Sequence, residues 1–170
     1  MKRLDMRGIT LLELLVVIAI CGILTGMAGY TVEGLHDRIE AERQIQEMYG
    51  DMMNARVQAV QGRRMYFVVV TADNYQIVED TNDSGGTAPD RGDTALWSVP
   101  KQFDVPSQWS GTIIMKGNGI MAKSTGPLQV DDALDIPFDA AGVKPEYDCI
   151  SVGPTRISEG KWNGRQCAEG

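Results

Sequence analysis

Apolar residues are concentrated in one segment near the N-terminus. Residues 14–32 form a run of 19 positions without a formal charge. As a helix this run would be about 28 Å long, close to the hydrocarbon thickness of a bilayer. Lys2, Arg3 and Arg7 precede the run, and positive charge on the short side favours a cytoplasmic N-terminus. The pattern therefore predicts a transmembrane helix.

The apolar pattern changes its period after residue 32. Apolar residues now recur at spacings of 4, 3, 4, 3 and 4, which places them on one face of a helix: Ala41, Ile45, Met48, Met52, Ala55 and Ala59. Charged and polar side chains occupy most of the positions between them. This pattern predicts an amphipathic helix over residues 33–62, with Gly62 as the residue that ends it.

Strand signals dominate the rest of the chain. Residues 65–71 and 75–79 are rich in β-branched and aromatic side chains, and a polar turn separates them. Further strands are predicted at 95–99, 112–116, 134–138 and 147–152. We expect an α+β fold in which a long N-terminal helix packs on an antiparallel β-sheet domain formed by residues 63–170.

The N-terminal apolar segment has three alternative fates. A signal peptidase would cleave near Gly26-Met27-Ala28, which fits a small-x-small site loosely. Acylation of Cys21, as in a lipoprotein, is disfavoured because Ile20 stands where a small residue is expected. Retention of the helix is favoured by Glu13, because an unpaired glutamate at a membrane segment costs on the order of a few kcal/mol and serves no purpose in a secretory signal.

The string Gly8-Ile9-Thr10-Leu11-Leu12-Glu13, followed by the apolar run, resembles the processing site of type IV prepilins and type II secretion pseudopilins. The resemblance implies that a prepilin peptidase cuts between Gly8 and Ile9 and methylates the new N-terminus. Residues 1–8 are then a basic leader, and residues 9–32 are a transmembrane and assembly helix. Ile9 departs from the phenylalanine that this family more often has there.

Glu13 becomes the fifth residue of the processed chain and a candidate assembly residue. In a filament, the new amine on Ile9 of one subunit could meet the Glu13 carboxylate of its neighbour. Such a pair is stronger in low dielectric than in water, although desolvation offsets part of the gain. The alternative to such a pair is that the Glu13 side chain simply extends to the membrane interface.

The three cysteines fall into two groups. Cys21 lies in the apolar run, where it is most simply a small apolar residue. Cys149 and Cys167 lie in the part expected to be periplasmic, where disulfides persist, and no CxxC motif is present. We predict a structural disulfide between them, with a stabilisation of about 3 kcal/mol.

The C-terminal sequence sharpens the resemblance. Residues 149–157 and 160–167 resemble minor pilins of the FimT/FimU type and the related H-type pseudopilins. This implies a non-enzymatic subunit without cofactor or metal, which primes pilus assembly at or near the tip. It also implies a single-pass inner-membrane protein with a periplasmic domain. Its partners would be prepilin peptidase, other minor pilins and the major pilin, or pseudopilins. An ordinary secreted binding domain or an anchored enzyme is the competing class.

Charge weighs against nucleic acid as a partner. The net charge is −7, and residues 73–148 carry 13 acidic against 5 basic side chains. From residue 149 onward the balance is +1. FimT-type pilins that bind DNA use a basic Gly-Arg-x-Arg motif, whereas Gly164-Arg165-Gln166-Cys167 lacks the second arginine. We therefore expect Arg156, Trp162 and Arg165 to form a subunit interface, and a DNA-binding minor pilin of natural transformation is the less favoured alternative.

Two remaining motifs carry little weight. Asp80-Thr81-Asn82-Asp83-Ser84-Gly85 matches the start of an EF-hand loop, but Arg91 stands where the twelfth position needs a glutamate. A solvated loop is the simpler interpretation, and calcium binding stays open. Arg91-Gly92-Asp93 spells an adhesion tripeptide, and matches of three residues arise by chance.

Overall fold

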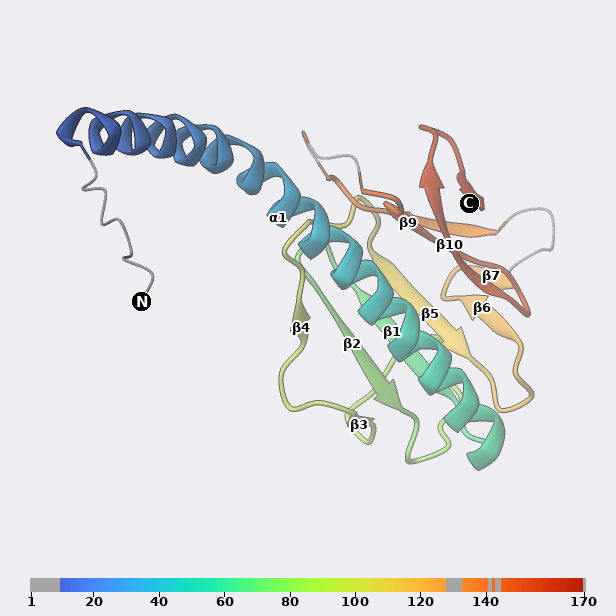
Figure 1. Ribbon diagram of the computed structural model, residues 1–170. Helices are drawn as coiled ribbons and strands as arrows, with labels where there is room; N and C mark the ends of the chain where they lie inside the picture. Colours follow the sequence, from blue (N-terminus) through green and yellow to red (C-terminus); the bar gives the residue numbers. More distant parts are fainter. Residues whose placement is uncertain (1–9, 128–132, 141, 143–144, 170) are drawn as a thin grey trace, which may run out of the picture. The chain divides into compact units, whose positions relative to one another are not determined.

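Figure 1 shows the chain as a computed structural model that describes residues 10–127, 133–140, 142 and 145–169. Side chains are described for all of these except residues 27–35 and 169. Within the described ranges, one helix, α1 (Leu11–Gly62), precedes a series of short strands. The chain divides into two units, Met1–Asp37 and Arg38–Gly170, and α1 contributes to both.

The strands form two antiparallel sheets. The first has the order β3-β2-β1-β5-β6-β7, with β4 also paired to β2, and the second has the order β11-β10-β9-β8. The first sheet contains β1 (Tyr66–Val70), β2 (Asn74–Glu79), β3 (Thr94–Ala95), β4 (Lys101–Gln102), β5 (Gly111–Met115), β6 (Met121–Lys123) and β7 (Gly126–Pro127). The second contains β8 (Leu134–Pro137), β9 (Cys149–Val152), β10 (Ile157–Trp162) and β11 (Cys167–Glu169).

These elements confirm an α+β fold with a long N-terminal helix and antiparallel pairing. They correct the expectation of a single sheet, because the chain builds two. Of the strand predicted at 95–99, only Ala95 lies in a strand, β3. Pro100 has no N–H to donate, which disfavours a longer strand here. β10 and β11 were not predicted, because Glu159, Gly160 and Lys161 interrupt the apolar alternation that marks a strand.

In the first unit, the apolar side chains at the start of α1 are exposed. Leu11 is 82% exposed and Leu12 is 73% exposed, and Leu14, Leu15, Val17, Ile18, Ile20, Ile23 and Leu24 each exceed half. Among the described residues, no helix combines the length and apolar character needed to cross a membrane. The transmembrane role of residues 9–32 therefore stays a prediction.

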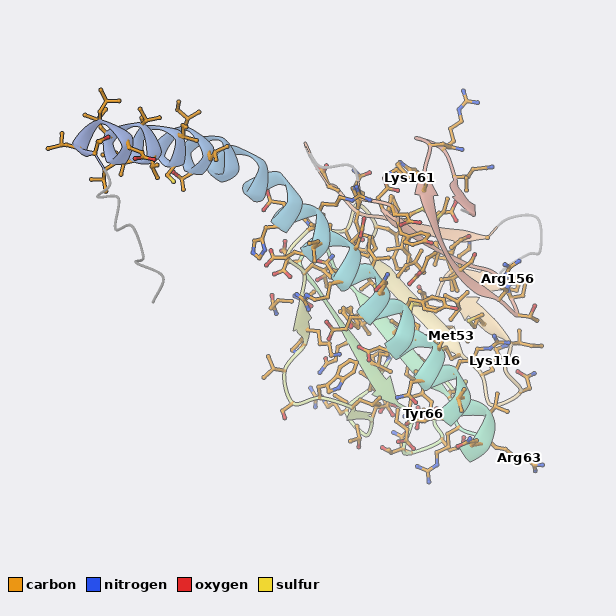
Figure 2. The ribbon with its side chains drawn as sticks, viewed as in Figure 1. Met53, Arg63, Tyr66, Lys116, Arg156 and Lys161 are labelled. Carbon is orange, nitrogen blue, oxygen red and sulfur yellow. A yellow bond between two sulfur atoms is a disulfide. The ribbon has the colours of Figure 1, made fainter. Side chains whose placement is uncertain are left out.

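In the second unit, the core lies between α1 and both sheets. All six positions of the predicted helix stripe are at most 1% exposed, including Met48 and Met52 at 0%. Both sheets supply apolar side chains to the same cluster: Val68, Val70, Ile77, Ile113 and Met115 from the first, and Ile136, Ile150, Val152 and Ile157 from the second. Figure 2 shows the side chains that fill this space. The period of the sequence thus identified the buried face of the helix correctly.

α1 ends at Gly62, as the sequence predicted, but the residue with the left-handed conformation is the next one. This residue is Arg63, with φ 51°. The Arg64 N–H donates to the Ala59 carbonyl at 3.2 Å, which satisfies an otherwise open carbonyl of the last turn. The backbone of Arg63 also packs on Gly117, where an added Cβ would lie 2.7 Å from the Arg63 carbonyl carbon.

Replacing Arg63 by glycine is expected to raise the free energy of unfolding by about 0.5–1 kcal/mol. Glycine adopts a positive φ without the steric cost that an L side chain incurs, although it also gains freedom in the unfolded chain. Urea unfolding followed by circular dichroism measures the difference. Gly62→Ala is the control, and it should be neutral or slightly stabilising. A large loss in Gly62→Ala with no gain in Arg63→Gly would contradict this helix end.

Candidate functional site

One candidate site is the start of α1, in the first unit. The predicted processing residues Gly8 and Ile9 lie outside the described residues. Thr10 caps the helix that follows: the Glu13 N–H lies 3.2 Å from the Thr10 hydroxyl and 3.0 Å from its carbonyl oxygen. Thr10 and Glu13 thus have the spacing of a capping box, a signal that the sequence analysis did not use. Glu13 also lies in the first turn, where the helix dipole favours negative charge.

This segment offers a large apolar surface next to a single acidic side chain. Contiguous exposed apolar surface of this extent is typical of segments that contact a membrane or another protein. The exposed thiol of Cys21 lies within it and forms no disulfide in the described structure.

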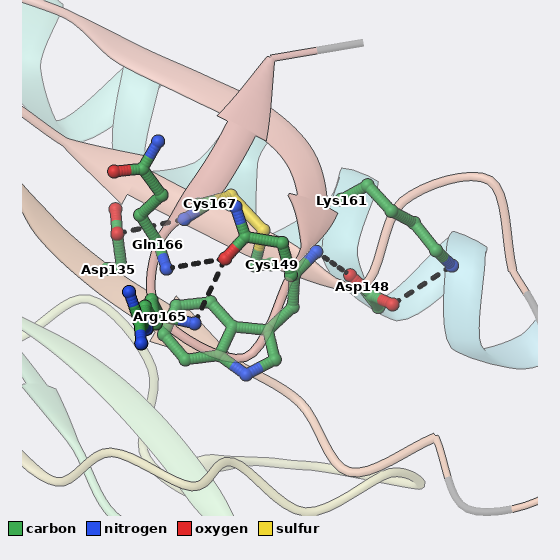
Figure 3. Close-up of a disulfide and its surroundings, with 9 residues drawn as sticks. Asp135, Asp148, Cys149, Lys161, Arg165, Gln166 and Cys167 are labelled. Atoms are coloured by element: carbon green, nitrogen blue, oxygen red, sulfur yellow. Dashed lines mark hydrogen bonds and ion pairs between the residues drawn. A yellow bond between two sulfur atoms is a disulfide. The ribbon is translucent and has the colours of Figure 1, made fainter.

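A separate candidate site, in the second unit, surrounds the disulfide between Cys149 and Cys167, which confirms the predicted pair (Figure 3). The bond joins β9 to β11 across β10, with the two Cα atoms 5.8 Å apart. Cys149 is fully buried. The C-terminal strand is therefore covalently tied to the centre of the second sheet.

Gly160 makes this close packing feasible. It pairs with Cys149 on one side and Glu169 on the other. An added Cβ would lie 2.3 Å from the Ala168 carbonyl oxygen and 2.9 Å from the Cys167 sulfur. A glycine is therefore required between the two strands that the disulfide joins.

Carboxylates hold the rest of the hairpin formed by β10 and β11. Asp148 accepts a hydrogen bond from the Trp162 N–H, and its other oxygen lies 2.9 Å from the Lys161 ammonium. Asp135 accepts from the Cys167 N–H at 2.9 Å (Figure 3). Because Lys161 also donates to the Pro145 carbonyl, its charge is engaged within the domain.

The structure brings together two of the three predicted interface residues. The Asn163 side chain accepts from the N–H groups of Arg165 and Gln166, at 3.0 Å each, which forms the tight turn after Trp162. Arg165 is exposed and Trp162 is half-buried at this turn. Arg156 lies at the opposite end of β10, at a distance of about 20 Å along the strand. Figure 2 labels Arg156 at one end of β10 and Lys161, the neighbour of Trp162, near the other.

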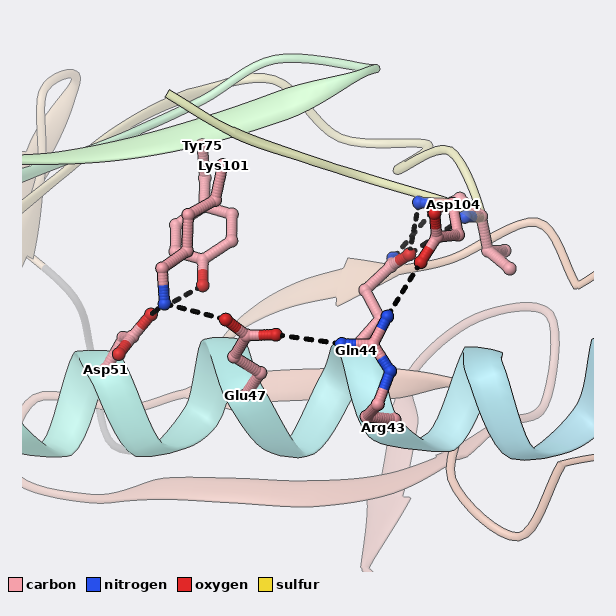
Figure 4. A network of polar contacts seen from close by, with 8 residues as sticks. Arg43, Gln44, Glu47, Asp51, Tyr75, Lys101 and Asp104 are labelled. Atoms are coloured by element: carbon pink, nitrogen blue, oxygen red, sulfur yellow. Dashed lines mark hydrogen bonds and ion pairs between the residues drawn. The ribbon is translucent and has the colours of Figure 1, made fainter. Parts of the chain in front are cut away.

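A polar network fastens the segment around β4 to α1 (Figure 4). The buried Gln44 side chain accepts from the N–H groups of Asp104 (2.7 Å) and Val105 (2.8 Å). It also donates to the Val105 carbonyl at 2.8 Å. All polar atoms of this amide side chain are thus used, and the segment is held in one position on the helix.

Lys101 extends the network along the helix. Its ammonium lies 2.6 Å from Asp51 and 2.7 Å from Glu47. Burial alone would lower the Lys101 pKa, but the hydrogen bonds to these two carboxylates outweigh it and raise that pKa. Burial, together with a 2.6 Å hydrogen bond to Asp51, raises the pKa of the Tyr75 hydroxyl. Each of these ionisable groups is paired with another, so the arrangement is suited to holding structure.

The acidic loop after β2 is closed by its own backbone. Asp80 is 2% exposed, and its two oxygens accept from the N–H groups of Ser84 (3.1 Å) and Gly85 (3.2 Å). The N–H of Gly92 donates to Asp90, and this hydrogen bond lowers the pKa of that carboxyl. Within the described part of the chain, no group of three or more His, Cys, Asp or Glu side chains is placed to hold a metal ion.

Comparison with known families identifies a prokaryotic N-terminal methylation motif at residues 3–29. The match covers residues 3–8 of the basic leader, the Gly8–Ile9 junction, Glu13 and most of the apolar run. No curated protein and no solved structure matches the chain.

The motif supports a type IV pilin-like protein, a component of a pilus or a pseudopilus. It implies processing by prepilin peptidase and assembly with pilin partners, in a protein that is first anchored in the membrane. The resemblance found in residues 8–13 is thereby confirmed at the level of the motif.

Proposed function

We propose that the chain is a minor pilin that primes or caps the assembly of a type IV pilus and has no enzymatic activity. In this proposal, residues 9–32 cross the inner membrane once, with the N-terminus in the cytoplasm and the disulfide-linked domain in the periplasm. After assembly the subunit lies at or near the pilus tip.

The methylation motif at residues 3–29 is the observation that carries the proposal. It leads directly into α1, whose first turn contains Glu13 and whose apolar side chains are exposed. Cleavage after Gly8 leaves a positive amine on Ile9, four residues before the Glu13 carboxylate. Neighbouring helices in a filament would cover the apolar surface and pair the amine of one subunit with the carboxylate of the next.

A type II secretion system offers the main alternative, since an H-type pseudopilin would carry the same motif. DNA binding as a minor pilin of natural transformation is less favoured. Lys161, one of three basic side chains after Cys149, is engaged by Asp148 and the Pro145 carbonyl. The two remaining arginines lie at opposite ends of β10 and offer few phosphate contacts.

Processing provides the direct test. Mass spectrometry of the protein extracted from membranes is expected to show a methylated Ile9 at the N-terminus. Gly8→Ala should leave the precursor uncut and anchored, because the peptidase needs the glycine before the cleaved bond. An N-terminus at Ala28 or Gly29 would show cleavage by a signal peptidase and would end the pilin interpretation.

Co-purification then separates the two filament systems. The processed chain should be recovered with other minor pilins and the major pilin in a strain that makes pili. Recovery with secretion pseudopilins alone would favour the type II secretion system.

A further inference from the structure

The face of the first sheet opposite α1 carries a small second core. Residues alternate between faces along a strand, so Ile113 and Met115 pack towards α1 while Ile114 points to the other side. The strand register aligns four side chains of that far face in one row across β2, β1, β5 and β6: Val78, Phe67, Ile114 and Ala122.

A groove of about 800 Å³ lies at the end of this row. Met65, Ile114 and Ala122 line it, and of these three only Met65 is more than slightly exposed. Residues 85–87 border the groove, and so does the turn from β6 to β7. Of the glycines in these borders, Gly86 is exposed, so its backbone groups are accessible without an intervening side chain. The Gly85 N–H donates to Asp80, and Gly126 pairs with Lys123 in the β6–β7 ladder.

The charge of the groove is opposite to that of the chain. Lys116 and Lys123 line it, and none of the described lining residues is acidic, although the whole chain has a net charge of −7. Among the described residues, no salt bridge neutralises either lysine. The groove thus combines two positive charges with the apolar side chain of Met65 and the exposed backbone of Gly86.

We propose that this groove binds an acidic, extended peptide segment of a partner protein. Carboxylates would meet Lys116 and Lys123, an apolar side chain would rest on Met65, and the peptide backbone would bond to the backbone of Gly86. The volume is at the upper end of the range for small-ligand sites, which suits a short peptide.

Other occupants fit less well. Two lysines provide too few phosphate contacts for firm binding of nucleic acid. A lipid chain needs a deep apolar site, whereas Ile114 is only 4% exposed and Ala122 only 7%. The proposal does not rest on the pilin assignment, because it uses only the surface of the second unit.

Fluorescence anisotropy with the full chain in neutral detergent tests the proposal. The probe is a labelled peptide that alternates glutamate with leucine or valine, and saturable binding is expected. Lys116→Gln combined with Lys123→Gln should weaken binding about ten-fold, the combined effect of two partly exposed charge pairs. Arg38→Gln is the matched control, which removes a partly exposed cation on α1, on the opposite face of the first sheet from the groove, and should change the affinity less than two-fold.

Two further probes define the recognised chemistry. A peptide with serine in place of leucine and valine should bind more weakly, and one with lysine in place of glutamate should not bind. The proposal is overturned if the glutamate peptide does not bind, or if the double lysine variant binds it unchanged. Equal or tighter binding of short single-stranded DNA or of anionic vesicles at the same lysines would also overturn it.

Discussion

Replacing Met52 by aspartate is expected to lower the free energy of unfolding by several kcal/mol. Met52 is fully buried in the cluster that α1 and both sheets share. An aspartate there would have to be buried without a partner or pull the helix away from the sheets. Urea unfolding of the full chain in detergent, followed by the intrinsic fluorescence of its tryptophans, measures the loss.

Val57→Asp is the matched control for this change. Val57 lies on the same helix but is 48% exposed, so a new carboxylate there stays in contact with water. We expect its unfolding midpoint to change little. Equal stability of the Met52→Asp variant and the unsubstituted chain would show that this stripe does not face the core.

The sequence was sufficient to identify this stripe because helical periodicity is a local signal. The spacings from Ala41 to Ala59 repeat through five intervals, and each of the positions is buried. The disulfide followed from an equally simple constraint, since only Cys149 and Cys167 lie beyond the helix. The strongest strands, β1 and β2, also carry dense apolar and β-branched side chains.

Features that depend on contacts between distant segments were not apparent in the sequence. In the sequence, Gln44 is indistinguishable from any other polar position of a helix. Its side chain nevertheless accepts hydrogen bonds from backbone N–H groups about sixty residues later in the chain. The left-handed residue after the end of α1 is Arg63 and not Gly62, in a position where Gly117 allows a close approach. The division into two sheets likewise depends on which strands meet in space, and periodicity along one strand does not encode that.

The separation of Arg156 from Trp162 is another feature that depends on the arrangement of the chain in space. Because the two residues are close in sequence, we predicted that they share one surface. The six residues of β10 are extended, however, and they place Arg156 and Trp162 at opposite ends of the strand. The interface proposed at the C-terminus is therefore narrower than the sequence predicted. It comprises the turn that carries Trp162 and Arg165, next to the disulfide.

Removing the disulfide is the second change with a large expected effect. Cys149→Ala combined with Cys167→Ala should lower the free energy of unfolding by about 2–5 kcal/mol. Alanine is preferred to serine because the site of Cys149 is fully buried and a hydroxyl there would lack a partner. The same variant should pair more weakly with other minor pilins, because β11 and the turn before it lose their covalent tie to β9.

Surface changes at the turn separate pairing from stability. Trp162→Ala and Arg165→Ala should weaken pairing in a pull-down with minor pilins while the unfolding midpoint stays nearly constant, since half-buried Trp162 offers apolar area and one donor to a partner. Arg156→Ala is the control, because it removes the same charge as Arg165→Ala at the far end of β10. If all three changes leave pairing intact but abolish a salt-sensitive shift of duplex DNA, the tail contacts nucleic acid and the interface lies elsewhere on the domain.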